Sequence, residues 1–138
     1  MRFWLALALL APLTANAEQV QVFGDWKVHY SAFPSTFLKP PIAALYSIKR
    51  SRDVGAINIT LLDVDDKPAN ASVSGHATNL LGQALGLSFR KITEGSAIYY
   101  IATLRYTDQE LLRFDLKVTP ENSPPLTVRF NQTLYWDE

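Results

Sequence analysis

The sequence predicts an all-β fold, namely an antiparallel immunoglobulin-like β-sandwich of about seven strands with one short helix. From Trp26 onward, apolar and polar residues alternate in short segments, which is the period of half-buried strands. Turn-forming residues separate these segments at intervals of about 8 to 12 residues, as in sandwiches and barrels. The chain has 138 residues and no cysteine, and a domain of this size buries enough surface to fold without disulfides.

The predicted strands follow one another with little intervening sequence. They comprise residues 26–32, 54–62, 71–78, 84–92, 97–105, 112–118 and 126–135, and residues 20–23 are a candidate for a further edge strand. The alternation is clearest where Leu112, Phe114 and Leu116 are separated by charged residues. Residues 98–101 are apolar on both faces, which indicates that their strand lies inside its sheet.

One connection, residues 34–53, is much longer than a hairpin loop, which usually has about 2 to 5 residues. Within it, Pro40 or Pro41 can begin a short helix, because proline is well tolerated in a first helical turn. Phe33, Phe37 and Tyr46 flank this helix. Such aromatic residues either plug the open end of the sandwich or form exposed anchors for a partner.

The first 17 residues have the composition of a secretory signal peptide. Arg2 precedes an apolar run, and Ala15-Asn16-Ala17 is a small-residue cleavage site. The run is too short for a bilayer, which needs roughly 20 apolar residues. The sequence therefore predicts cleavage after Ala17, a single domain over residues 18–138 and no remaining membrane span. Export without cysteine favours a bacterial periplasm.

The segment HATNLLGQ, residues 76–83, is predicted to end a strand and form its hairpin loop. We expect Asn79 to bond the local backbone, Gly82 to adopt a positive φ, and Leu80 or Leu81 to plug the core. If consecutive strands run antiparallel, this loop shares one end of the sandwich with the long connection. On the functional interpretation, Asn79 and Gln83 supply polar contacts beside the apolar anchors Phe33, Phe37 and Tyr46.

Composition and motifs argue against several other classes of function. Loss of Arg2 leaves 12 basic residues (13 minus 1) and 13 acidic ones, a net charge of −1, so no nucleic-acid footprint is expected. His29 and His76 lie on the polar sides of their strands, and there is no cysteine and no G-x-S-x-G elbow. We therefore predict no catalytic residues, no metal site and no cofactor.

Several motifs are similar to an uncharacterised bacterial family catalogued as domain of unknown function 4426. They are Phe23-Gly24-Asp25-Trp26, His29-Tyr30, 33–38, Tyr46, Ile48, Arg50-Ser51, Asn58-Ile59, Ser74-Gly75, 78–83, 97–100 and 112–115. The resemblance covers nearly the whole chain after the signal peptide and implies an exported single-domain protein of proteobacteria. It implies no activity, cofactor or catalytic residue. At position 31 the chain has serine where the family more often has asparagine.

The sequence thus predicts a non-enzymatic periplasmic module that contacts a protein or another envelope component through loops at one end. A first alternative is an edge strand that accepts an extended peptide, as in assembly chaperones. A second is a small-molecule-binding protein or an enzyme, which would need a cavity where polar groups such as His29 or His76 converge.

Overall fold

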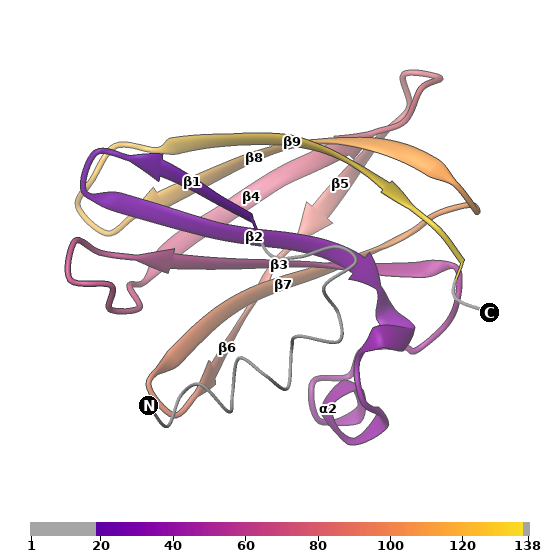
Figure 1. Ribbon diagram of the computed structural model, residues 1–138, viewed down its shortest axis with the longest axis horizontal. Helices are drawn as coiled ribbons and strands as arrows, with labels where there is room; N and C mark the ends of the chain where they lie inside the picture. The colour runs from indigo at the N-terminus through magenta and orange to yellow at the C-terminus, as the bar shows by residue number, and fades with distance from the viewer. Residues whose placement is uncertain (1–18, 137–138) are drawn as a thin grey trace.

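The computed structural model describes residues 19–136, which form two antiparallel sheets packed face to face (Figure 1). The first sheet has the order β1 (Gln19–Phe23), β2 (Trp26–Pro34), β3 (Val54–Leu62), β7 (Ala97–Arg105) and β6 (Arg90–Glu94). The second has the order β5 (Ala84–Ser88), β4 (Ala71–Thr78), β8 (Glu110–Pro120) and β9 (Leu126–Leu134). The predicted β-sandwich is confirmed, β1 is the expected edge strand, and β7 lies inside its sheet.

Alternating apolar residues of both sheets fill the space between them. The buried cluster includes Val28 and Tyr30 of β2, Ile57, Ile59 and Leu61 of β3, Tyr100, Ala102 and Leu104 of β7, and Leu112, Phe114, Leu116 and Val118 of β8. The aromatic ring of Phe130 links the two sheets, because its centroid lies 4.4 Å from that of Tyr30 and 4.7 Å from that of Phe114. Apolar burial of this kind is the main stabilising contribution to a sandwich.

The prediction of one strand over residues 84–92 is wrong, and the described chain has nine strands instead of about seven. β5 pairs with β4 in the second sheet, whereas β6 pairs with β7 in the first, and the ladder is interrupted at Phe89. The chain thus changes sheet at a corner of the sandwich, as strands do where they bend. Neither glycine nor proline marks the bend at 88–90, so the composition gave no indication of it.

The long connection covers the outer face of the first sheet. It contains a 3₁₀ turn, η2 (Ser35–Phe37), and the helix α2 (Pro40–Leu45), which begins at the predicted proline. Ala43 and Ile48 of this connection are buried, as is Ala56 on the outward side of β3. These three residues do not belong to the main cluster between the sheets. The connection therefore adds a second, smaller apolar layer outside the sandwich.

A network of short polar contacts closes the long connection where it rejoins the sheet. The Ser35 hydroxyl, which is fully buried, donates to the Ser51 carbonyl (3.1 Å) and accepts from the Ser51 N–H (3.0 Å). Asp53 accepts a hydrogen bond from the Ser51 hydroxyl and pairs with Arg105 of β7 at 2.9 Å. The Ser51 hydrogen bond, followed by the charge of Arg105, lowers the pKa of Asp53 from its ordinary 3.8.

We expect this lowered pKa to make the protein less stable in acid. Since folding favours the Asp53 carboxylate, its contribution is complete above the ordinary pKa of 3.8 and is lost as the pH falls through the lower folded value. Urea denaturation at a series of pH values from neutral to acid measures the free energy of unfolding. In Asp53→Asn this free energy should fall less with decreasing pH than it does in the unchanged protein. Asp25→Asn is the control, because Asp25 is exposed in the turn between β1 and β2. An identical pH dependence for Asp53→Asn and the unchanged protein would contradict the expectation.

Candidate functional site

The loop between β4 and β5 is held by hydrogen bonds that centre on Asn79. The Asn79 Oδ1 atom accepts from the N–H groups of Leu81 and Gln83, both at 3.0 Å, and its Nδ2 donates to Gln83 Oε1 at 2.8 Å. Gly82 has a φ of +82°, and its N–H donates to the Asn79 carbonyl. The predicted roles of Asn79 and Gly82 are therefore confirmed.

The prediction that Leu80 or Leu81 plugs the core is wrong. Leu80 is 69% exposed and Leu81 is 84% exposed. Figure 1 shows the reason, because the β4–β5 loop extends beyond the end of the two sheets, away from the apolar interior. Residues 77–89, which include this loop, contain no charged side chain. The hairpin tip, defined here as residues 79–83, is thus an uncharged and internally bonded projection with two solvent-exposed leucines.

The predicted aromatic anchors belong to the long connection over the outer face of the first sheet, whereas the hairpin tip extends from the second sheet. Phe33 is buried, and its ring is stacked at 6.4 Å on that of Phe37. The Tyr46 hydroxyl donates to Glu94 of β6, and Arg90 of the same strand donates to the Tyr46 carbonyl. Partial desolvation, followed by the Glu94 carboxylate, raises the pKa of Tyr46. These contacts fasten the long connection to the first sheet.

The structure therefore brings together only part of the predicted contact surface. The stacked pair Phe33–Phe37 and Tyr46, which is bonded to β6, belong to the long connection, whereas Asn79 and Gln83 bond each other at the hairpin tip. Both connections leave their strands at the same end, but α2 turns down over the first sheet while the hairpin extends from the second (Figure 1). That the five residues bind a partner stays a prediction, and the geometry assigns the two groups different surroundings.

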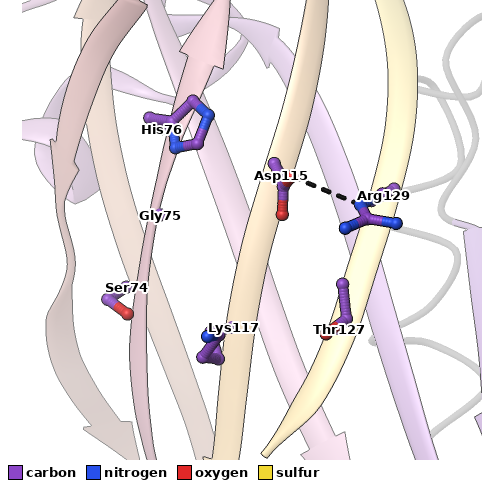
Figure 2. A pocket seen from close by; sticks show the side chains of 7 residues that line it. All are labelled: Ser74, Gly75, His76, Asp115, Lys117, Thr127 and Arg129. Carbon is purple, nitrogen blue, oxygen red and sulfur yellow. Dashed lines mark hydrogen bonds and ion pairs between the residues drawn. The ribbon is translucent and has the colours of Figure 1, made fainter.

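A second polar surface lies on the outer face of the second sheet. A depression of about 390 Å³ is lined by Ser74, Gly75 and His76 of β4, Asp115 and Lys117 of β8, and Thr127 and Arg129 of β9. Figure 2 shows these side chains on three neighbouring strands, with the Asp115–Arg129 ion pair at 3.2 Å along one margin. Within residues 19–136, no hydrogen bond or ion pair engages the side chain of Ser74, His76, Lys117 or Thr127.

Sequence reasoning missed this depression although its residues carried a visible pattern. The alternation placed Ser74 and His76 on the polar face of one strand and Asp115 and Lys117 on that of another. The pairing of β4 with β8, and of β8 with β9, makes those faces one surface. Strand order in a sheet depends on contacts distant in sequence, so the polar faces could not be joined without the tertiary structure.

The two histidines do not share a site. His29 belongs to β2 in the first sheet and His76 to β4 in the second, and each lies between inward-facing residues of its strand. They therefore face outward on opposite sheets. Within the described chain, no three or more histidine, cysteine, aspartate or glutamate residues are grouped closely enough to hold a metal ion.

The edge strand β1 meets the description of a peptide-accepting edge only in part. Its sequence QVQVF has neither charge nor proline, and Val20 and Val22 are exposed. However, the Gln21 side chain donates to the Arg129 carbonyl of β9 at 2.9 Å, which ties β1 to the second sheet. Peptide binding at this edge stays a prediction.

The chain matches a known protein family over nearly all of its described residues. The model of the family described as "Domain of unknown function (DUF4426)" matches residues 20–137. The chain belongs to the DUF4426 family. A crystal structure of a DUF4426 family protein from Pseudomonas aeruginosa PAO1 is 40% identical, with a TM-score of 0.81, and the match covers 88% of this chain and 97% of that one. The family resemblance predicted from the motifs is confirmed.

More distant structures share the fold of this DUF4426 protein. FetP from uropathogenic Escherichia coli strain F11, recombinantly expressed in the periplasm, is 10% identical with a TM-score of 0.64, over 89% of this chain and 97% of FetP. A copper-bound variant of FetP is 10% identical with a TM-score of 0.60, over 86% and 95%. No curated protein matches the chain at a significant level.

The predicted signal peptide, residues 1–17, and its cleavage site lie outside the described residues. Between residues 19 and 136, the structure contains no helix with the length and apolarity needed to cross a bilayer.

Proposed function

We propose that this DUF4426 protein is a non-enzymatic module of the bacterial periplasm that contacts the lipid surface of the envelope through its hairpin tip. The observation that carries the proposal is the exposure of Leu80 and Leu81 on a loop without charges. The periplasmic assignment is supported by the signal-peptide pattern and by the shared fold of FetP. Two adjacent leucines that are this exposed on a projecting loop favour an interaction of the loop with another apolar surface.

The hydrogen bonds of the tip lower the cost of placing it in a lipid interface. An unpaired peptide group is unfavourable in an apolar medium because it loses its bonds to water. In the tip, the N–H groups of Asn79, Leu81, Gly82 and Gln83 all donate within the loop. The Asn79 and Gln83 side chains also bond each other. Water can therefore leave the tip while most of its donors keep their partners.

The composition of the tip favours a lipid over a protein partner. The residues that contribute most at protein interfaces are tryptophan, tyrosine and arginine, whereas leucine is under-represented among them. Residues 77–88 contain no aromatic residue and no arginine, and Leu80, Leu81 and Leu85 are their exposed large apolar side chains. Leucine is favourable in the apolar part of a membrane.

The test is vesicle flotation of the exported protein with phosphatidylethanolamine–phosphatidylglycerol vesicles. Full burial of one leucine contributes about 1.5 to 3 kcal/mol, so Leu80→Asp with Leu81→Asp should reduce the bound fraction at least about tenfold. Val64→Asp is the matched control, because Val64 is 64% exposed in the turn after β3, at the other end of the strands. That variant should float like the unchanged protein.

Two results would overturn the lipid proposal. One is failure of the unchanged protein to float with the vesicles. The other is equal flotation of the tip variant and the Val64→Asp control. If the unchanged protein ignores vesicles but binds an envelope protein that the tip variant loses, the contact is with protein instead of lipid.

A further inference from the structure

We propose that the depression on the outer face of the second sheet binds a phosphate group, independently of the hairpin tip. Three polar side chains form a row across three strands there. Ser74 of β4 is paired with Lys117 of β8, and Lys117 is paired with Thr127 of β9. Paired residues on one face project in the same direction from strands about 4.8 Å apart. The row thus offers two hydroxyls and an ammonium group to one ligand (Figure 2).

The charges in the depression favour an anion. Asp115, which is its only carboxylate, accepts from Arg129 Nε at 3.2 Å, so that pair is close to neutral. Lys117 makes no ion pair with any residue from 19 to 136. One positive charge therefore remains, and the terminal nitrogens of Arg129 keep donors that Asp115 does not use.

Donors exceed acceptors in the depression, and this favours phosphate over a metal ion or a neutral sugar. His76, on β4 opposite Asp115, adds a ring nitrogen at the upper margin in Figure 2. A phosphate has several oxygen acceptors that can use such donors together, and its bonds to lysine and arginine are charge-assisted. A cation would find one carboxylate already engaged by arginine.

The shape of the site follows from small residues on β4 and β9. Ser74 and Thr127 are short, which leaves about 390 Å³ between the longer side chains, and Gly75 lines the depression between Ser74 and His76. This volume accommodates a phosphate together with part of the molecule that carries it. Because the depression opens to solvent on the face of a sheet, binding is expected to be weak and rapidly reversible.

The experiment is an NMR titration of the exported protein with inorganic phosphate, against chloride at equal ionic strength. Saturable amide shifts are expected on β4, β8 and β9 around the depression. Lys117→Met should lower the affinity for phosphate at least about tenfold, which is the loss expected for one charge-assisted hydrogen bond. Lys91→Met is the control, because Lys91 is exposed on β6 of the other sheet, and it should bind phosphate normally.

Two further arms separate the sources of phosphate and the two proposals. Vesicles with phosphatidic acid test a lipid headgroup, and stronger retention than on phosphatidylglycerol vesicles, lost in Lys117→Met, would identify that source. The Leu80→Asp, Leu81→Asp variant should retain the inorganic phosphate shifts, so failure of the hairpin proposal leaves this one testable. No saturable shifts, or equal shifts in Lys117→Met, would overturn the phosphate site if the variant's thermal midpoint shows that it is folded.

Discussion

Replacing Gly75 with alanine is expected to lower the free energy of unfolding by about 3 kcal/mol, through overpacking and backbone strain together. An alanine Cβ at this position would lie 2.4 Å from the Asp115 carbonyl oxygen and 2.8 Å from the Leu116 Cα. Both atoms belong to the backbone of β8, so no side-chain rotation relieves the clash. The φ of Gly75 is +153°, which a residue with a Cβ rarely adopts.

The matched control for this variant is Gly86→Ala on β5. Gly86 is paired with His76, the residue that follows Gly75 on β4. A Cβ on Gly86 would meet no atom within 4 Å. Urea denaturation should therefore show a change within about 0.5 kcal/mol for Gly86→Ala, as for most surface substitutions. Equal stability of the two variants would show that β4 and β8 do not approach as closely as described.

Replacing Phe114 with alanine is expected to lower the free energy of unfolding by about 3 to 5 kcal/mol, the usual range for a buried phenylalanine. Phe114 is 2% exposed and is stacked on Phe130 at 4.7 Å between the ring centroids. Because Phe130 also contacts Tyr30 of the first sheet, the loss of the Phe114 ring leaves a cavity beside the contact that joins the sheets.

The more conservative variant Phe114→Leu separates the loss of volume from the loss of an apolar side chain. It retains most of the buried apolar surface and leaves a smaller cavity, so it should lower the free energy of unfolding less than Phe114→Ala does. Urea midpoints and near-ultraviolet circular dichroism would follow both variants, since the rings of Phe130 and Tyr30 lose a neighbour. A loss below about 1 kcal/mol for Phe114→Ala would contradict the described packing.

Features that depend on short stretches of chain were predictable from sequence. Alternation identified the main strands apart from the 84–92 run, and the pair Pro40-Pro41 marked the start of α2. The Asn79 and Gly82 roles were also predictable, because a hairpin loop is bonded mainly within itself. For the same reason, the loop that carries the proposed lipid contact was located correctly, although the direction of its leucines was not.

Features that depend on distant contacts were not predictable. Phe89 continues the apolar pattern of residues 85 and 87, yet the ladder stops there and the chain changes sheet. Leucine is a residue type common in protein cores, yet Leu80 and Leu81 are exposed because the hairpin extends beyond the sandwich. Likewise, Ser74, Lys117 and Thr127 are unremarkable polar residues until the sheet places them in one row.

By itself, the sequence determined that this chain is a β-sandwich of the DUF4426 family with an aromatic-rich connection and an Asn79-centred loop. These features follow from residue periodicity, turn chemistry and family motifs, all of which act along the chain. The tertiary structure alone decided that the aromatic residues of the long connection lie apart from the hairpin tip, and that side chains of three strands line one depression. The physical reason is that strand order and sheet membership depend on pairing between distant segments, which local sequence does not encode.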